Sequence, residues 1–223
     1  MIDVIVFGAP GRDEAHRRCF ASIEASDIGK NYTLMLHPEG MHKNEHWKQT
    51  HLRAAEAKSE FVLVLEDDVL VNRFILENID SWRWKWNKDF GAGWVYRPGG
   101  YGKGDTWYMG ARPWAMTPGV VYRTADLPRY VEGAMKLMAP GARYEHAWDC
   151  AIAWAATENG KRIRVHNPSL VEHMNDVPSK LGNTNKSVLR TSKGTFRETW
   201  RRPKDDANGI VDRFGRPVNP NQR

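Results

Sequence analysis

Short apolar runs alternate with longer amphipathic stretches in the first third of the chain. Residues 2–8 (IDVIVFG), 32–36 (YTLML) and 61–65 (FVLVL) are apolar and rich in β-branched side chains, which predicts buried strands. The stretches at 13–25 and 44–58 contain many helix formers and no Gly or Pro, which predicts helices. Three strands separated by two helices predict a βαβαβ unit with a parallel sheet.

The second part of the chain is less regular. We expect helices at 72–80, 126–138 and 145–159 and strands at 119–123 and 162–166. After Gly182 the apolar periodicity is lost, and polar, Gly and Pro residues dominate. The pattern therefore predicts one α/β domain over residues 1–185, with helices flanking a mixed, mostly parallel sheet, and a tail over residues 186–223.

Composition narrows the class of protein. The chain is 41% hydrophobic and 27% charged, as in ordinary globular proteins. No apolar run reaches the length of about 18 residues that a membrane span needs, and no basic segment precedes the first apolar run, so we expect neither a membrane span nor a secretory signal. Two cysteines, Cys19 and Cys150, are too few for a disulfide framework. A cytoplasmic location is expected, which for a phage-encoded protein is the host cytoplasm.

The positive charge of the chain is concentrated in the predicted tail. Residues 186–223 carry ten Lys and Arg against four Asp and Glu, whereas the other 185 residues carry 23 of each. Such asymmetry favours contact with a polyanion, either DNA or an anionic membrane surface. A solvated tail with no partner is an equally good interpretation of the same pattern.

The strongest chemical signal is the run Glu66-Asp67-Asp68, which follows the strand at 61–65. Ligands of open α/β sheets bind outside the carboxyl ends of the strands. Clustered carboxylates repel one another, and a hard cation such as Mg²⁺ or Mn²⁺ relieves that repulsion while it binds phosphate oxygens. The run therefore favours a site for a metal–phosphate complex over an acidic loop that only caps the next helix.

Three segments resemble GT-A glycosyltransferases. The run LEDDV resembles the acidic DxD motif of that family, PSLVEHMNDVPSKLG (168–182) resembles its C-terminal metal-histidine segment, and EHAWDCAIAWAA (145–156) resembles the helix start that carries the base of many inverting members. The matches span about residues 2–182 in the family's order. The resemblance implies a Rossmann-like GT-A fold and transfer of a sugar from a nucleotide-sugar, with a UDP-sugar expected.

The same resemblance assigns roles by position. Asp68 and His173 would hold Mn²⁺ or Mg²⁺, while Glu66 and Asp67 would orient the metal's water and the nucleotide ribose. Glu66 departs from the family's usual Asp, and its longer side chain leaves the ribose contact open. Asp149 would be the base that accepts the acceptor's proton; in a retaining enzyme it would hold the acceptor instead.

Further residues would surround the donor. The resemblance places the nucleotide at the loop after the first strand, which contains Pro10 and Arg12. Lys180 and Arg53 are additional candidates to place positive charge near the diphosphate. A surface ion pair is the competing interpretation for the two arginines, and a solvated side chain is the competing interpretation for the lysine.

The resemblance places the acceptor in a Trp-rich region, where Trp94, Trp107 and Trp114 offer flat faces to a sugar ring or an extruded base. Core packing is the alternative use of these rings. With the basic tail, the region favours a hydroxymethylated pyrimidine in phage DNA as acceptor, and a bacterial surface glycan or lipid-linked sugar is the alternative. A nucleotidyltransferase and a non-catalytic nucleic-acid-binding protein are the rival classes. The sequence leaves the oligomeric state open.

Overall fold

The computed structural model describes residues 2–82, 88–95, 106–108, 118–145, 147–174, 176 and 196–201. The elements in chain order are β1 (Ile2–Gly8), α1 (Asp13–Glu24), β2 (Thr33–Leu36), α2 (Lys43–Ala55), β3 (Phe61–Glu66), β4 (Val69–Val71), α3 (Ile75–Asp80), β5 (Phe90–Trp94), β6 (Thr106–Tyr108), β7 (Gly119–Arg123), a 3₁₀ turn (Thr124–Asp126), α4 (Leu127–Leu137), α5 (Trp148–Glu158), β8 (Arg162–Val165) and β9 (Val171–His173). Every strand and helix predicted above is present, with its ends shifted by a few residues at most.

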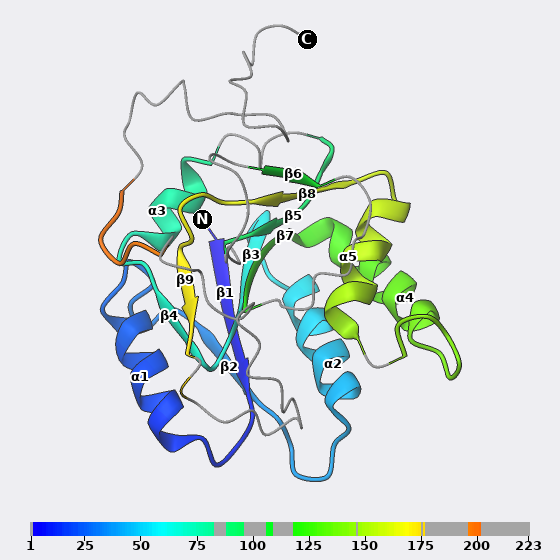
Figure 1. Ribbon diagram of the computed structural model, residues 1–223, viewed down its shortest axis with the longest axis horizontal. Coiled ribbons are helices and arrows are strands. Elements are labelled where there is room, and N and C mark those ends of the chain that lie inside the picture. Colours follow the sequence, from blue (N-terminus) through cyan, green and yellow to red (C-terminus); the bar gives the residue numbers. More distant parts are fainter. Residues whose placement is uncertain are drawn as a thin grey trace, which may run out of the picture.

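A seven-stranded sheet in the order β2-β1-β3-β7-β5-β8-β6 forms the centre of the molecule (Figure 1). β1 pairs in parallel with β2 and β3, and β5 pairs in parallel with β8, whereas β7 and β6 run antiparallel to their neighbours. The predicted mixed, mostly parallel sheet is thus confirmed. Because β1, β3 and β5 point the same way, their carboxyl ends lie at one edge of the sheet.

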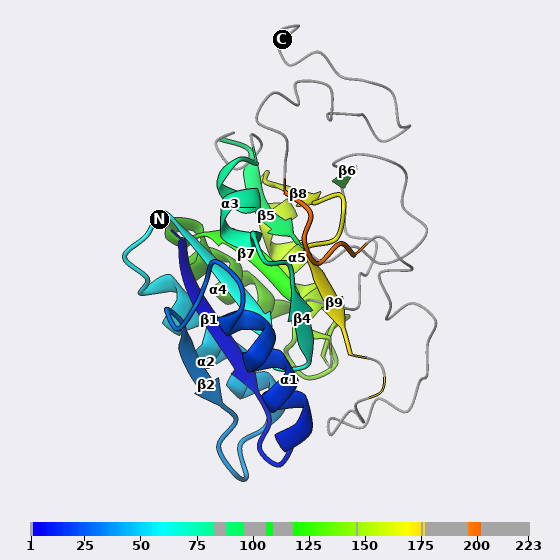
Figure 2. The same ribbon diagram turned by 90° about the vertical axis from the view of Figure 1, so that its left-hand side faces the viewer.

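Helices cover both faces of this sheet, and each face buries its own apolar cluster. α2, α4 and α5 lie on one side, and α1 and α3 lie on the other (Figures 1 and 2). Side chains of β3 alternate between the two clusters, with Val62 and Val64 on the α5 side and Leu63 and Leu65 on the α1 side. None of the helices in the described part of the chain has the length and apolar character that crossing a membrane requires.

A second, two-stranded sheet joins β4 to β9 in antiparallel pairing, and Figure 2 shows these strands side by side. Val69 lies opposite His173, and Val71 lies opposite Val171. Neither strand was predicted, because three residues are too few for a periodic signal. This small sheet holds the segment around residue 173 against the chain that leaves β3.

The described part of the predicted tail, residues 196–201, lies against α3 and the segment before it. The side-chain amides of Asn72 and Asn78 are fully buried, and both donate to the carbonyl oxygen of Trp200, at 2.9 and 3.0 Å. The Trp200 ring also packs edge-on against His166, with ring centroids 5.6 Å apart. This short segment is therefore attached to the domain rather than separate from it.

Candidate metal centre

Glu66, Asp67 and Asp68 lie at the sheet edge where the carboxyl ends of β1, β3 and β5 meet. Glu66 ends β3, and the alternation of that strand directs its side chain toward the α5 side of the sheet. Asp67 and Asp68 form the turn into β4 and are 2% and 6% exposed. Buried carboxylates this close together repel one another, so the fold must supply each with a compensating partner.

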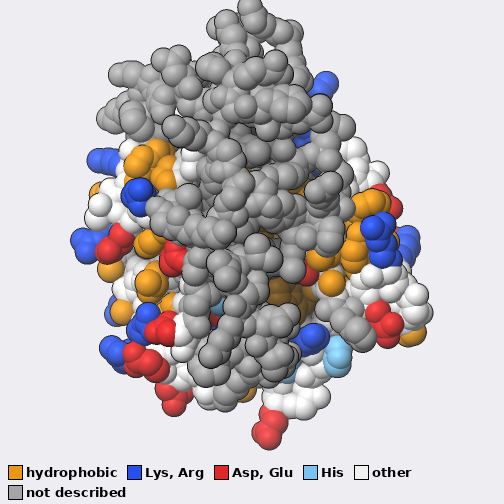
Figure 3. All heavy atoms as spheres, in the orientation of Figure 1, with side chains coloured by type: hydrophobic (Ala, Val, Ile, Leu, Met, Phe, Trp, Pro, Cys, Tyr) orange, Lys and Arg blue, Asp and Glu red, His pale blue; other side chains and the backbone are white. Residues whose placement is uncertain are grey.

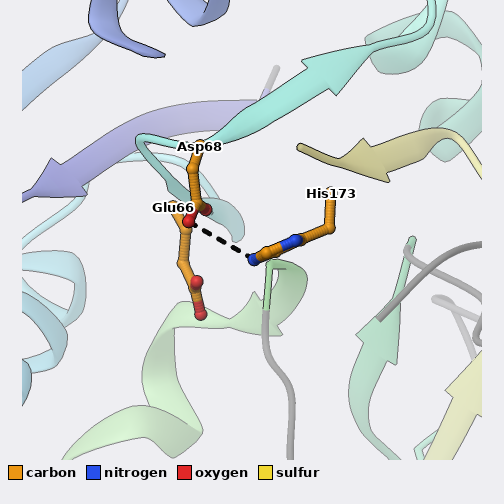
Figure 4. A group of neighbouring side chains, drawn as sticks. All are labelled: Glu66, Asp68 and His173. Carbon is orange, nitrogen blue, oxygen red and sulfur yellow. Dashed lines mark ion pairs between the residues drawn. The ribbon is translucent and has the colours of Figure 1, made fainter. Parts of the chain in front are cut away.

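The β4–β9 ladder brings His173 to Asp68. Val69 is paired with His173, and the backbone N–H of Met174 donates to the carbonyl oxygen of Asp68 at 2.8 Å. His173 Nε2 consequently lies 3.3 Å from Asp68 Oδ2, and Figure 4 shows the two side chains pointing toward each other. Ligand atoms of Glu66, Asp68 and His173 all lie within 4.8 Å of one another. The structure thus brings the two predicted metal ligands together and places Glu66 beside them.

Asp67 has a different set of partners, all from the loop and helix that follow β1. Its Oδ2 accepts a hydrogen bond from the Ala9 N–H at 3.0 Å and lies 2.6 Å from His16 Nε2. Its Oδ1 accepts from Arg12 Nη1 at 2.8 Å. Gly8 leaves the necessary space, because a Cβ there would lie 2.1 Å from Asp67 Oδ2. Asp67, predicted to orient the ribose or the metal's water, therefore ties the β1–α1 loop to the end of β3. Gly8 and His16 were not among the predicted site residues.

Arg12 bridges the two aspartates. Its Nη1 donates to Asp67, and its Nη2 donates to Asp68 Oδ2 at 2.6 Å, with only 10% of the arginine side chain exposed. Burial alone would lower the pKa of Arg12, but the charges of Asp68 and Asp67 raise it above its usual value. Pro10, also predicted near the nucleotide, is exposed in the same loop. The predicted donor-side loop thus reaches the acidic cluster through its arginine.

The carboxylates of the cluster differ in their protonation. Burial opposes ionisation of Asp68, but the hydrogen bond and charge of His173, together with Arg12, lower the pKa of Asp68 to about 2. For Glu66, burial and the negative charge of Asp68 act in the same direction and raise the pKa to about 8. Asp68 Oδ1 is buried and has no hydrogen-bond partner among the described residues. An ionised carboxylate next to an imidazole is a donor set that fits a divalent cation.

Asp149 lies in the first turn of α5, at the side of the sheet toward which Glu66 points. Its Oδ1 accepts a hydrogen bond from the Cys150 N–H at 2.8 Å. Burial raises the pKa of Asp149, and the charge of Asp149 in turn contributes to the raised pKa of Glu66. The structure therefore places the predicted base on the same side of the sheet as Glu66.

Two other predicted residues lie elsewhere. Arg53 forms an ion pair with Glu56 and, with Asp3 and Lys58, lines a cavity at the start of β1. In a βαβ crossover the helix runs back along the sheet, so the last turn of α2 lies at the amino ends of the strands, away from Asp68. Trp94 is 3% exposed and packed in the core, rather than on a surface that could receive an acceptor.

The remaining predicted residues fall outside what the structure describes. Lys180 and Trp114 are not among the described residues, and only the backbone of Trp107 is described, in β6. Their roles at the diphosphate and at the acceptor stay predictions from the sequence.

Comparisons with known proteins identify the fold. A scan against models of protein families and a search of curated proteins both find no match. Among solved structures, the chain is similar to a glycosyltransferase involved in the glycosylation of the major capsid of PBCV-1, with 14% identity, a TM-score of 0.51, and coverage of 77% of this chain and 93% of that chain. S. aureus TarS matches with 14% identity, a TM-score of 0.50, and coverage of 73% of this chain and 35% of TarS. The α/β fold predicted from the sequence is thus the fold of known transferase structures, and identity this low shows the fold alone.

Proposed function

We propose that the protein is a metal-dependent glycosyltransferase that moves a sugar from a nucleoside-diphosphate sugar, with a UDP-sugar as the expected donor, to an acceptor hydroxyl. The observation that carries the proposal is the meeting of Asp68 and His173, 3.3 Å apart, with Glu66 beside them. This group stands at the carboxyl edge of an open α/β sheet, where such sheets bind their ligands. The fold shared with a capsid glycosyltransferase supports the same conclusion.

The ligand atoms suit Mn²⁺ or Mg²⁺. Both ions prefer carboxylate oxygens, and Mn²⁺ also accepts an imidazole nitrogen. Asp68 and His173 would hold the ion, with Glu66 within reach of it. A divalent cation in this position supplies Lewis-acid stabilisation of the negative charge that develops on the leaving diphosphate. Arg12 adds a second positive charge from the side of the β1–α1 loop.

Asp149 is proposed to accept the proton of the acceptor hydroxyl. A carboxylate whose pKa is raised by burial is a stronger base than an exposed one, and Asp149 has such an environment near Glu66. This assignment belongs to an inverting reaction. In a retaining enzyme no such base is required, and Asp149 would instead hold the acceptor.

For the acceptor we propose a hydroxymethylated pyrimidine in DNA. The support is the positive excess of residues 186–223, which could bind phosphates. On the described part of the face in Figure 3, acidic and basic side chains are interspersed. A surface glycan or lipid-linked sugar is the second acceptor to be tried in the same assay.

The test is release of nucleoside diphosphate. The protein is incubated with Mn²⁺ and a panel of nucleotide-sugars, alone, with hydroxymethylated DNA and with glycan acceptors. We expect nucleoside diphosphate to be released only in the presence of the cation and one of the donors. Asp68→Asn should abolish this release while the variant keeps its fold. Asp176→Asn, which removes an exposed carboxylate paired with Arg18, is the matched control and should remain active.

If nucleoside diphosphate release depended on neither the cation nor the donor, the proposal would be refuted. The rival class, a non-catalytic nucleic-acid-binding protein, makes the opposite forecast for Asp68. Because a carboxylate cluster repels phosphate, the Asp68→Asn protein would then bind DNA as well as the wild type or better, and neither protein would turn over a donor.

A further inference from the structure

We propose that Arg12 competes with the cation for Asp68. Its guanidinium stays paired with Asp68 until the oxygens of a bound nucleoside diphosphate replace that carboxylate, so that the cation and the nucleotide bind cooperatively. The inference rests on the proposed function, because it concerns the same site. It adds a way in which that site avoids holding a cation without a donor.

The first argument is the identity of the oxygen that Arg12 contacts. Arg12 Nη2 donates at 2.6 Å to Asp68 Oδ2, and this is also the oxygen that lies 3.3 Å from His173 Nε2. A cation bound between this oxygen and His173 therefore competes with Arg12 for Asp68 Oδ2. The guanidinium and the cation are both positive, and their repulsion in a site shielded from water is strong. Arg12 should accordingly weaken cation binding to the protein alone.

The second argument is that Arg12 has an anchor that does not depend on Asp68. Arg12 Nη1 donates to Asp67 Oδ1 at 2.8 Å. Asp67 is itself fixed from its other oxygen by the Ala9 N–H and by His16, at 3.0 and 2.6 Å. Arg12 can thus release Asp68 and still remain at the border of the site, with its second nitrogen available to an anion.

The third argument concerns what that anion would be. The β1–α1 loop begins where β1 ends, at the sheet edge where the acidic cluster lies. A diphosphate bound at this edge brings several negative oxygens within reach of a guanidinium, whose planar arrangement of N–H groups suits phosphate. The exchange of Asp68 for a phosphate oxygen keeps Arg12 paired and leaves Asp68 to the cation. Each ligand therefore makes binding of the other more favourable, as linkage requires.

A permanent structural ion pair is the competing account of the same contacts. If Arg12 stays on Asp68 under all conditions, its role is to orient the carboxylate, and removing it should loosen cation binding. The two accounts predict opposite signs for one measurement, which makes them separable.

The experiment titrates Mn²⁺ into wild type, Arg12→Gln, Arg12→Lys and Arg17→Gln without nucleotide and follows the free ion by electron paramagnetic resonance. Arg17 pairs with Glu14 on the exposed side of α1, so Arg17→Gln removes the same charge without touching the site. We expect Arg12→Gln to bind Mn²⁺ at least about fivefold more tightly than the wild type, the lower end of usual couplings, and Arg17→Gln to match the wild type. Arg12→Lys keeps the charge but cannot bridge both aspartates, so its affinity for Mn²⁺ should lie between those of the wild type and Arg12→Gln.

A second measurement follows UDP by equilibrium dialysis with and without Mn²⁺. Wild type should bind UDP more tightly when Mn²⁺ is present, and Arg12→Gln should lose part of that gain. Unchanged or weaker Mn²⁺ binding by Arg12→Gln would overturn the inference and leave the proposed function standing. If Arg12→Gln does not fold, Arg12→Lys takes its place in the test. Mn²⁺ binding by Arg12→Lys that is no tighter than that of the wild type would then overturn the inference in the same way. If no protein binds Mn²⁺ with or without UDP, the metal-dependent function falls, and this inference falls with it.

Discussion

Replacing Gly8 with Ala tests whether the close approach of β1 to Asp67 maintains the acidic strand end. The added Cβ would lie 2.1 Å from Asp67 Oδ2, 2.3 Å from its Cγ and 2.4 Å from its Cβ, where ordinary contacts begin at 3.4 Å. Asp67 or β1 must therefore shift by about 1 Å. The carboxylate cannot move that far and keep hydrogen bonds of 2.6 to 3.0 Å to Ala9, Arg12 and His16 within bonding range.

The size of the effect follows from two costs. Overpacking a well-packed site destabilises a protein by about 1–3 kcal/mol, and each lost hydrogen bond to a charged group costs about 1.5–3 kcal/mol more. We expect Gly8→Ala to lower the free energy of unfolding by about 3 kcal/mol or more. For a chain of this length, that corresponds to a melting temperature lower by roughly 6–12 °C.

Urea denaturation followed by circular dichroism measures the change. Gly119→Ala is the matched control, because its Cβ would also be crowded, at 2.8 Å, but only by methyl groups of Val95, Val171 and Leu65. That variant carries the overpacking cost without displacing a carboxylate, so it should lose less stability than Gly8→Ala. Equal losses in the two variants, or a Gly8→Ala protein as stable as the wild type, would show that the Asp67 contacts are not what Gly8 protects.

Three further predictions concern catalysis, pH and the cation. Asp149→Asn should lower kcat by about 10²–10⁴-fold without changing the melting temperature, and full activity would remove the base assignment. Burial lowers the pKa of His51 from 6.5 to about 4, so below pH 6.5 the unfolded chain takes up a proton that the folded protein excludes. The contribution of His51 to stability should thus fall by about 3 kcal/mol from pH 6.5 to 4. Over this range the wild type should therefore lose about that much more stability than His51→Gln, as measured from urea midpoints. Mn²⁺ at about 100 times its dissociation constant should stabilise the wild type by about 2.7 kcal/mol, seen as a rise in melting temperature. An equal rise for His173→Ala would argue against His173 as a ligand of the ion.

The main elements could be predicted because their signals are local. Strands such as 61–65 and helices such as 126–138 carry their periodicity within the segment, so β3 and α4 appear within a residue or so of the expected bounds. The convergence of Asp68 and His173 was anticipated only through the resemblance to a family. The strands that produce it, β4 and β9, have three residues each, and their pairing spans about a hundred residues of chain.

The residues that sequence reasoning misplaced depend on tertiary structure. Arg53 was a candidate to place positive charge near the diphosphate, but the direction of α2 takes it to the opposite end of the sheet. Trp94 was read as a ligand-binding ring, and its strand turned out to be central and buried on both faces. A weak signal existed for His16, which follows Arg12 by four residues and so lies on the same face of the first helical turns.

The division of roles among three consecutive acids follows from the register of a single strand pair. Phe7 is opposite Glu66 in the parallel ladder of β1 and β3, which sets the next residue of each strand, Gly8 and Asp67, side by side. Asp67 then faces α1, as Leu65 does, while Glu66 faces α5 and Asp68 turns to β9. A slip of one residue would exchange the faces, so that Asp67 would lose its donors and Glu66 its place beside His173. The acidic motif therefore indicates chemistry at this edge, but only the pairing of β3 with a β1 that ends in glycine decides which acid anchors the loop and which is left for a cation.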